Sequence, residues 1–425
     1  MSDDPILGIR EDWGQDTPVI LGNSDRRHHL YVIGQTGSGK STLLENMALQ
    51  DIFAGRGIGF VDPHGDSARA ILDRIPNFRK DHVVYLDPSD REAAVGMNLL
   101  ANVPPERRHL VASGVVRAFK GLNPDFFGPR MEYFFAAAVA ALLDCNNTSL
   151  FGLQRMLTDE RYRAWVVRQV KDPVVRYIWT SQFESYDRKT QAEIVSPILN
   201  KVGPLFMTPQ VRHILGQVRS RVDARFMMDN SRIFIANLSK GLLGEDKTNI
   251  LGSFLVSQFE HAAMSRADIP QVDRRDFHLY VDEFQAFVTS SFASLLSEAR
   301  KYRLCLTLAH QYTDQLQDGI SEAVVGNVGS LVSFRVGHED AEALEKAFGR
   351  TYAASAFTSL NNGEVYAKLL SNGRNLDAFR ARTFPPFDVR RGKADDIIKR
   401  SRERYGTRRE DVEGKIARWL GGFRT

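Results

Sequence analysis

The chain has 425 residues, of which 43% are hydrophobic, and a formal net charge of +4 at pH 7. This length suits two domains or one enlarged α/β domain, and the apolar content is sufficient to fill a core. The two cysteines, Cys145 and Cys305, lie far apart and form no CxxC pattern. Their placement argues against a disulfide framework or a zinc knuckle and fits a reducing cytosol.

The sequence contains no long apolar segment. The longest strongly apolar run, FFAAAVAALL at 134–143, is about half as long as a helix that spans a bilayer. The acidic start, MSDD, lacks the basic region and apolar core of a signal peptide. We therefore expect a cytoplasmic protein with neither an anchor nor a signal peptide in this sequence.

Positive charge is concentrated at the end of the chain. Residues 389–425 contain 12 Lys and Arg against 6 Asp and Glu, so this segment carries +6 and the remainder −2. A basic tail can contact phosphate backbones, but IIKRSRERYG and RREDVEGKIARWL also have the pattern of amphipathic helices with solvated charged faces. Charge alone favours the second interpretation.

Seven β-like runs bounded by turn residues recur along the chain, and helical stretches separate most of them. This alternation predicts an α/β fold with a mainly parallel sheet covered by helices. The runs are HLYVIG, GIGFVD, HVVYLD, RIFIANL, FHLYVDEF, LCLTLA and SLVSFRV.

The pattern changes between about Pro104 and Val222, where β-like runs disappear and helical periodicity dominates. Prolines and glycines interrupt this region at points where helices must end. We therefore expect three parts. These are a nucleotide-binding domain formed by 1–103 and 223–388, an all-helical insert domain at 104–222, and a basic helical tail at 389–425.

The segment GQTGSGKS at 34–41 matches the phosphate-binding pattern G-x-x-x-x-G-K-[ST]. It follows a β-like run and precedes the helix-like TLLENMALQDIF, which is the context that the pattern requires. Glycines let backbone N–H groups surround phosphate oxygens, Lys40 spans the outer phosphates, and the Ser41 hydroxyl ligates Mg²⁺. The predicted ligands are ATP and Mg²⁺, and the predicted binding residues are Gly34, Thr36, Gly37, Ser38, Gly39, Lys40, Ser41 and Thr42.

Hydrolysis also needs an acid that holds the metal and a group that orients water, and FHLYVDEF supplies both. Asp282 ends a buried-looking strand, where its carboxylate can hold the magnesium shell, and the adjacent Glu283 can polarise the attacking water. Surface strands often end in acids, but the upstream P-loop favours the catalytic interpretation.

A further buried-looking strand, LCLTLA, follows these acids and ends in His310 and Gln311. This order predicts the P-loop class in which an extra strand lies between the two nucleotide-binding strands. Gln311 would then lie near the γ-phosphate and could sense hydrolysis. A polar strand-end residue in a turn is the alternative.

Several segments, in this order, resemble the motor domain of type IV coupling proteins, the TraG/TraD class of the FtsK/HerA superfamily. The resemblance runs from about His29 to Arg382. The P-loop is shared with many families, whereas the DPHGD strand, the FGPRMEYF entry into the helical insert and the block from DEFQAF to AHQ are far more specific. The segments are GQTGSGKSTLL, GIGFVDPHGD, VVYLDPSD with GMNLL, FFGPRMEYFFAAAVAALL, LYVDEFQAF and EARKYRLCLTLAHQYTDQL.

The resemblance implies a RecA-like ATPase that forms a homo-hexameric ring and feeds DNA to a conjugative secretion channel. Relaxase or relaxosome and channel proteins are the implied partners, and the helical insert would be the all-α domain that receives DNA or relaxase cargo. Arg300 matches the arginine that reaches the neighbouring subunit's nucleotide and neutralises charge there. A solvated helix arginine is the alternative for Arg300, and Arg335 is the rival candidate.

Two residues near the second strand complete the predicted site. Asp62, in FVDPHGD, is expected to shape the site beside the P-loop. His64 lacks the partners that would make it a metal ligand.

One departure from the class concerns the membrane. Coupling proteins typically carry N-terminal membrane helices, whereas here about thirty polar residues precede the P-loop. The anchor would be supplied by another chain, removed from this one, or absent in a soluble branch. The first two cases place the protein at the inner face of the cell membrane.

Three functions remain as alternatives at this point. The first is the DNA-pumping hexamer of conjugation, and the second is a soluble FtsK/HerA-like translocase in repair, segregation or phage defence. The third is a nucleotide-gated adaptor whose helical insert recruits protein cargo. A nucleotide kinase is disfavoured because no lid-like arginine cluster is visible in the sequence.

Overall fold

The computed structural model describes residues 4–12, 15–122, 127–288, 292–312, 316, 320–388 and 392–421. Its contacts divide the chain into two compact units. The first comprises Met1–Tyr85, Ala224–Ser239 and Phe259–Arg400, and the second comprises Leu86–Asp223, Lys240–Gln258 and Ser401–Thr425.

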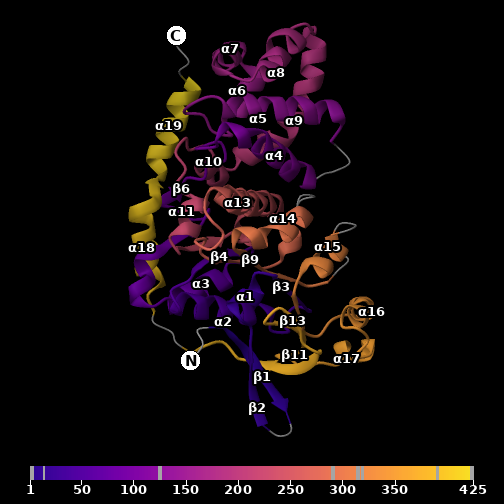
Figure 1. The fold of residues 1–425 in the computed structure, drawn as a ribbon. Helices are drawn as coiled ribbons and strands as arrows, with labels where there is room; N and C mark the ends of the chain where they lie inside the picture. Colours follow the sequence, from indigo (N-terminus) through magenta and orange to yellow (C-terminus); the bar gives the residue numbers. More distant parts are fainter. Residues whose placement is uncertain are drawn as a thin grey trace. The chain divides into compact units, whose positions relative to one another are not determined.

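An eleven-stranded sheet forms the centre of the first unit (Figure 1). The order across the sheet is β2-β1-β14-β11-β10-β3-β9-β8-β4-β7-β5. The strands are β1 (Ile6–Asp12), β2 (Gln15–Ile20), β3 (Leu30–Ile33), β4 (Gly57–Asp62), β5 (Val83–Leu86), β7 (Ile233–Asn237), β8 (Phe277–Val281), β9 (Leu304–His310), β10 (Ser330–Ser333), β11 (Glu364–Lys368) and β14 (Phe379–Thr383).

The seven β-like runs of the sequence are all strands, and they form one continuous part of the sheet from β10 to β5. Strands β10, β3, β9, β8, β4 and β7 pair in parallel. Strands β3, β4, β8 and β9 are buried along their whole length, as expected for parallel strands covered on both faces. The predicted mainly parallel sheet is therefore confirmed.

The sequence patterns do not predict β1, β2, β11 and β14, which pair antiparallel at the other side of β10. Strand β14 alternates between buried and exposed residues, and β2 buries only Val19 and contains Pro18. A proline is tolerated in β2 because this strand lies at the edge of the sheet. Such strands lack the strong apolar run on which the predictions depended.

Helices α2 (Lys40–Phe53) and α3 (Asp66–Arg74) pack against β4. Leu44, Met47 and Ala48 of α2 are fully buried, so one face of this helix belongs to the core. The other helices of the first unit are α1 (Asn23–Arg26), α11 (Ala224–Asp229), α14 (Phe292–Glu298), α15 (Ile320–Asn327), α16 (His338–Ala347), α17 (Ala354–Thr358) and the larger part of α18 (Ala394–Tyr405).

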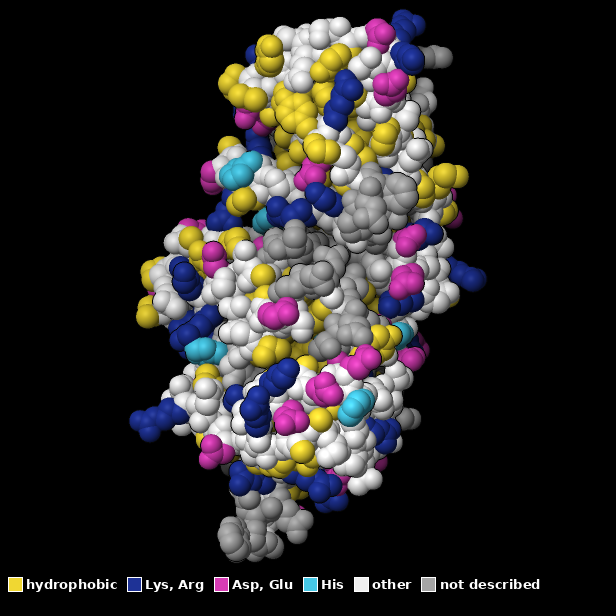
Figure 2. Space-filling view, turned by 90° about the vertical axis from the view of Figure 1, so that its right-hand side faces the viewer, with side chains coloured by type: hydrophobic (Ala, Val, Ile, Leu, Met, Phe, Trp, Pro, Cys, Tyr) yellow, Lys and Arg dark blue, Asp and Glu magenta, His cyan; other side chains and the backbone are white. Residues whose placement is uncertain are grey.

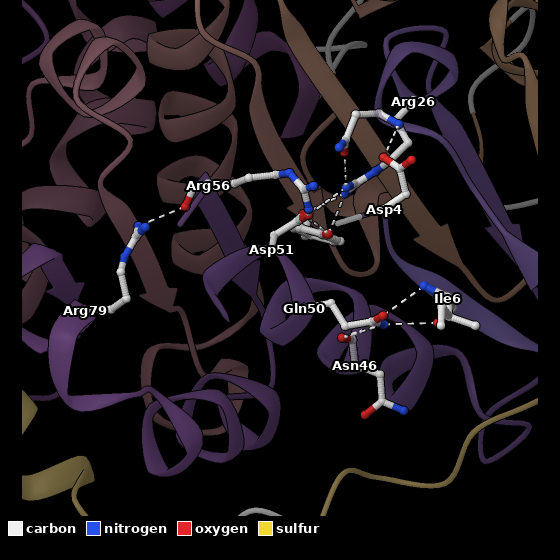
Figure 3. A network of polar contacts seen from close by, with 10 residues as sticks. Asp4, Ile6, Arg26, Asn46, Gln50, Asp51, Arg56 and Arg79 are labelled. Carbon is white, nitrogen blue, oxygen red and sulfur yellow. Dashed lines mark hydrogen bonds and ion pairs between the residues drawn. The ribbon is translucent and has the colours of Figure 1, made fainter. Parts of the chain in front are cut away.

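A buried ion pair fixes the carboxyl-terminal half of α2 (Figure 3). Arg26 donates from Nη1 and Nη2 to the two carboxylate oxygens of Asp51, at 2.7 Å each. Arg56 lies 3.0 Å from Asp51 Oδ1, and the Tyr280 hydroxyl on β8 donates to Asp51 Oδ2 at 2.6 Å. Burial raises the pKa of Asp51, but the charge of Arg26 outweighs this effect and holds the pKa below its usual value. The network ties the helix that follows the P-loop to β8 and to the segment before β3.

The second unit is mainly helical. Its core includes an aromatic cluster in which Trp179 packs against Phe134 and Phe183. Its helices are α4 (Arg108–Leu122), α5 (Pro129–Leu143), α6 (Gly152–Thr158), α7 (Glu160–Gln169), α8 (Pro173–Tyr177), α9 (Arg188–Met207), α10 (Pro209–Leu215), α12 (Lys240–Leu243), the larger part of α13 (Glu245–Ser265), and α19 (Arg409–Gly421).

Residues 104–222, the expected insert domain, contain α4 to α10 and no strand within their described part. The second unit is wider than this range and also includes 240–258 and 401–425. The expected helical tail, 389–425, contains α18 and α19 but also a short strand, β15 (Gly406–Arg408), which pairs antiparallel with β6 (Ala93–Val95).

Many charges of α18 are engaged within the protein. Arg400 contacts Asp81 at 3.0 Å, and Arg402 contacts Asp90 at 2.5 Å. These pairs favour the amphipathic interpretation of this helix over a free basic arm.

On the face shown in Figure 2, Lys and Arg side chains are interspersed with Asp and Glu. Within the described residues, no helix combines the length and apolar character needed to cross a membrane.

Candidate active site

The carboxyl ends of four neighbouring parallel strands lie side by side, at the same end of the strands. The register aligns Ile33 with His310, Leu308 with Val281, and Val281 with Val61. The loops that follow β3, β9, β8 and β4 therefore lie side by side, where open parallel sheets bind ligands. As predicted, β9 lies between β3 and β8. These loops carry the P-loop, Gln311, the Asp282 and Glu283 pair, and Asp62.

The P-loop connects β3 to α2, and two of its glycines have backbone conformations that other residues rarely adopt. Gly37 has φ +76° and Gly39 has φ +120°. A Cβ on Gly34 would lie 2.5 Å from the Cβ of Phe334, and one on Gly39 would lie 2.9 Å from the ring of Phe334. A Cβ on Gly37 would meet no atom within 4 Å. The loop is therefore packed on one side and open on the other, which leaves space for an anion beside its backbone N–H groups.

Lys40 begins α2, and its side chain is buried. Its Nζ donates to the carbonyl oxygens of Gly34, at 2.5 Å, and Gln35, at 3.1 Å. Burial lowers the pKa of Lys40, and the carboxylates of Asp282 and Glu283 oppose this shift. The amine thus lies inside the loop, where the carbonyl oxygens of the loop itself bind it.

Ser41 and Asp282, the two residues predicted to hold Mg²⁺, are in direct contact. The Ser41 hydroxyl donates to Asp282 Oδ2 at 2.9 Å, and Asp282 is almost fully buried. Burial raises the pKa of Asp282, and the nearby Asp62 raises it further. A cation at this point would relieve the cost of the buried negative charge.

Glu283 has a left-handed backbone conformation, with φ +47°, and is buried. Non-glycine residues in this conformation persist where the surrounding structure holds them, often at active sites. The oxygen Oε1 of Glu283 accepts a hydrogen bond of 2.6 Å from Gln311 Nε2. It also lies 2.8 Å from His64 Nε2. Both contacts therefore converge on the same oxygen of the carboxylate.

Gln311 links this carboxylate to the P-loop, because its amide oxygen accepts a hydrogen bond of 2.9 Å from the Thr36 hydroxyl. The expected place of Gln311, at the end of β9 beside the nucleotide loop, agrees with this contact. Ser38 donates to the carbonyl oxygen of Gln35 at 2.7 Å, within the loop, and Thr42 lies in the first turn of α2.

Asp62 shapes the turn between β4 and α3. Its carboxylate accepts hydrogen bonds of 2.8 Å from the backbone N–H groups of His64 and Ala68. The position of Asp62 beside the site was expected, but the contact between His64 and Glu283 was not. It depends on the neighbouring positions of β4 and β8, which no sequence motif indicated.

The two candidate arginines lie at opposite ends of the parallel strands. Arg300 lies in a 3₁₀ turn, Ala299–Tyr302, ahead of the amino end of β9. Its Nη1 is 3.3 Å from Nδ1 of His28, which precedes β3. Arg300 is therefore at the amino end of the parallel strands, whereas its own P-loop is at their carboxyl end.

Arg335 follows β10, and its carbonyl oxygen accepts a hydrogen bond of 2.8 Å from the N–H group of Gln35. In the described part of the chain, its guanidinium forms neither a hydrogen bond nor an ion pair with another residue. The structure thus brings Arg335, and not Arg300, to the P-loop of the same chain. The assignment of an arginine that acts on a neighbouring subunit stays a prediction.

The residues present fit a magnesium nucleotide. No group of three or more His, Cys, Asp or Glu side chains in the described residues could hold a metal alone. Mg²⁺ needs no such group, because it is usually bound by one or two protein oxygens together with phosphate oxygens and water. Ser41 and Asp282 supply the protein oxygens, and the open side of the loop at Gly37 has room for phosphates.

The sheet order and these loop contacts define a RecA-like P-loop protein. No protein-family model matches the chain. The sequence is 22% identical over 379 residues to the type 4 coupling protein DotL of Legionella pneumophila. The match covers 74% of this chain and 48% of DotL, so the chain spans about half the length of this curated relative.

Solved structures show the same fold. The bacterial conjugative coupling protein TrwB, without its first segment and unbound, is similar with a TM-score of 0.68 and 16% identity over 92% of this chain and 91% of TrwB. TrwB in complex with ADP and Mg²⁺ gives a TM-score of 0.64 at 17% identity over 93% and 92% of the two chains. VirB4 of Thermoanaerobacter pseudethanolicus gives 0.58 at 14% identity over 90% and 96%.

These similarities confirm the resemblance to type IV coupling proteins that the motifs predicted. They also confirm the RecA-like fold.

Proposed function

We propose that the chain is an ATP-hydrolysing motor that moves DNA through a homo-hexameric ring, as part of a conjugative type IV secretion system. The observation that carries the proposal is the contact between Ser41 and Asp282 beside a P-loop, with Glu283 held next to it. TrwB, whose fold this chain shares, has been determined with ADP and Mg²⁺ and with nonhydrolysable nucleotide analogues.

In this proposal the chain's own residues divide the work of hydrolysis. Lys40 and the P-loop N–H groups bind the phosphates. Ser41 and Asp282 would hold Mg²⁺, which would supply positive charge beside the phosphate oxygens. Glu283 takes a proton from the water that attacks the terminal phosphorus, and the bond to the β-phosphate oxygen breaks. Gln311 lies between Thr36 and Glu283, where it would respond to the loss of the terminal phosphate.

A cavity of about 790 Å³ in the second unit is a candidate contact for the DNA backbone. We call it the basic cavity and define it by Arg219, Arg221, Arg408 and Lys415, which line it together with Asp411. All four cationic residues are exposed, and their side chains form no hydrogen bond or ion pair within the described residues. Unpaired cations of this kind suit phosphate oxygens.

Cargo, channel and location belong to the same proposal. DotL and TrwB are named as coupling proteins, and by similarity this chain would work with relaxase or relaxosome and with secretion-channel proteins. It would act on the cytoplasmic side, at the inner face of the membrane, through a partner or an anchor outside this sequence. The three parts expected from the sequence would then be a motor domain, a cargo-receiving insert and a tail.

Two other functions are kept as alternatives. A soluble FtsK/HerA-like translocase in repair, segregation or phage defence would have the same site and the same ring. A nucleotide-gated adaptor would bind ATP but would not respond to DNA, so that DNA-stimulated hydrolysis separates it from both motors.

The test is ATP hydrolysis by the purified chain with and without DNA, together with DNA affinity at increasing salt. We expect stimulation by DNA of any sequence, and an affinity that falls steeply with salt, because a channel that passes any sequence must contact phosphates. Reversing Arg219 and Arg221 to Glu should weaken DNA binding and reduce its salt dependence. Arg374→Glu, at an exposed arginine of the first unit, is the matched control. Strong preference for one short sequence, or no effect of DNA on hydrolysis, would contradict a pump.

A further inference from the structure

His64 lies on a turn whose backbone is fixed at several points. The carboxylate of Asp62 accepts hydrogen bonds from the N–H groups of His64 and Ala68, at 2.8 Å each. The next residue, Gly65, has φ +96°, and a Cβ there would lie 2.6 Å from Asn237 Oδ1. The turn therefore has little freedom, and the imidazole of His64 is presented in a defined direction.

The imidazole of His64 contacts the carboxylate of Glu283. Strands β4 and β8 are parallel neighbours with Val61 opposite Val281, so the turn after β4 and the turn after β8 lie next to each other. His64 Nε2 is 2.8 Å from Glu283 Oε1, and the side chains are 50% and 8% exposed, respectively. The contact thus joins a half-exposed donor to a buried acceptor.

Three carboxylates meet here, and each has its own donors. Asp62 is bound by two backbone N–H groups, and Asp282 accepts from Ser41. Glu283 accepts from the side chains of Gln311 and His64. No other acid in the site receives a hydrogen bond from the His64 ring within the described residues, so His64 serves Glu283.

We propose that His64 is a positioning residue that, together with Gln311, fixes the carboxylate of Glu283 in the orientation in which it accepts a proton from water. This inference rests on the proposed function, because it assigns His64 to the base of the ATP hydrolysis. A base acts only within hydrogen-bond reach of the proton that it removes. Two donors from different strand ends, Gln311 and His64, meet at the same oxygen, Oε1, and so fix the position of that oxygen.

The charges around His64 agree with this role. Its pKa is raised, first by the hydrogen bond to Glu283 and then by the negative charges of Glu283, Asp62 and Asp282. A donor that is more often protonated binds a carboxylate more strongly, so the surroundings strengthen the contact. Gln311, the other donor to Glu283, is itself bound to the P-loop, because its amide oxygen accepts a hydrogen bond from the Thr36 hydroxyl.

The kinetic test compares His64→Ala with His64→Gln, because glutamine keeps an N–H donor of similar reach. We expect His64→Ala to lower kcat for ATP hydrolysis by about tenfold to a hundredfold, the range for a misplaced catalytic group, with KM for ATP within about twofold of the wild type. His64→Gln should recover most of the loss. The control is His338→Ala, which removes an exposed histidine that lies 3.8 Å from Glu342 and should leave the rate unchanged.

A second comparison asks whether His64 acts through Glu283. In a Glu283→Gln background, His64→Ala should cause no further loss of the residual rate, because the base that it positions is already absent. Wild-type kcat in His64→Ala, the same defect in His64→Gln as in His64→Ala, or an undiminished loss in the Glu283→Gln background would each overturn the proposal.

A measurement without catalysis separates this inference from the proposed function. NMR of the folded protein with ¹³C-labelled histidine should show that the pKa of His64 is higher in the wild type than in Glu283→Gln. Equal values would show that the contact does not form and would overturn the inference. If the wild type bound ATP but failed to hydrolyse it, the proposed function would be wrong, and the titration would still decide whether His64 holds Glu283.

Discussion

The hydroxyl of Ser41, at the start of α2, donates a hydrogen bond of 2.9 Å to Asp282, which follows β8. The two residues are far apart in the sequence, and the parallel strands between them bring their loops together. This contact joins the phosphate-binding loop to the acidic loop. The two loops therefore form one site, in which the role of each residue can be tested by mutation.

The first prediction separates binding from hydrolysis. Lys40→Ala removes an amine that lies inside the P-loop, and it should weaken ATP binding by about tenfold or more, as expected for a lost hydrogen bond to a charged group. Glu283→Gln should retain ATP affinity and lose hydrolysis by about 100-fold to 10,000-fold, the range for a general base. Nucleotide affinity by calorimetry and steady-state rates provide the two measurements. Hydrolysis by Glu283→Gln at the wild-type rate would show that another group is the base.

The second prediction concerns the buried pair of Arg26 and Asp51. Asp51→Ala leaves the Arg26 guanidinium buried without its partner, which should lower the free energy of unfolding by about 3–5 kcal/mol. The double variant Arg26→Met with Asp51→Leu removes both charges and should be clearly more stable than Asp51→Ala. Denaturant unfolding of the three proteins measures the difference. Equal stability of wild type and Asp51→Ala would show that the pair does not support the fold.

The third prediction is a loss of stability in acid. Burial lowers the pKa of His29 to about 4 and those of His278 and His310 to about 3. An unfolded histidine has a pKa of about 6.5, so between about pH 6.5 and pH 3 the unfolded chain binds more protons than the folded one. Stability that is present above pH 6.5 is therefore lost as the pH falls, by up to about 1.4 kcal/mol per pH unit for each buried histidine.

His278 is the residue with which to test this pH dependence. Neither ring nitrogen of His278 has a hydrogen-bond partner within the described residues. His278→Phe should therefore reduce the dependence of Tm on pH between 7 and 5 without removing a hydrogen bond of the ring. His338→Gln, at an exposed position, is the control. A Tm that falls with acid equally in wild type and His278→Phe would contradict the assignment.

The sequence predicts the parts of this molecule that depend on local patterns. The buried strands have near-continuous apolar runs, and the P-loop has a fixed spacing, so both were predicted. In the sequence, the strand that ends in Gln311 follows the strand that ends in the two acids. From this order we predicted that β9 lies between β3 and β8, and the structure confirms it.

The remaining features depend on contacts between distant segments. The antiparallel strands β11 and β14 gain their stability from each other rather than from their own composition. The bond between His64 and Glu283 exists because β4 lies beside β8, and the single motif FVDPHGD contains no sign of it. Arg300 lies beyond α14, which ends at Glu298, and occupies a 3₁₀ turn rather than the helix considered as the alternative for it.

The last prediction is that each active site is completed by the neighbouring subunit. Arg300 is exposed and lies at the edge of the sheet away from its own P-loop, with His28 as its contact. Its planar guanidinium suits phosphate oxygens, and we therefore expect it to serve a site on another subunit. Arg300→Ala should bind ATP normally and lose hydrolysis by a factor on the order of a thousand, the range for a supplied arginine.

Mixing experiments distinguish Arg300 from Arg335. A subunit with Arg300→Ala has an intact P-loop, and a subunit with Lys40→Ala has an intact Arg300, so a mixed ring contains some complete sites if Arg300 acts on its neighbour. Activity should then return when two inactive proteins are mixed under conditions in which subunits exchange. Arg335 holds the P-loop of its own chain through its carbonyl oxygen. If Arg335 acts in the site of its own subunit, that site needs Arg335 and Lys40 from the same chain. Each variant lacks one of the two, so mixing Arg335→Ala with Lys40→Ala should not restore activity. Full activity of Arg300→Ala alone, or of dilute monomers, would refute the role of Arg300.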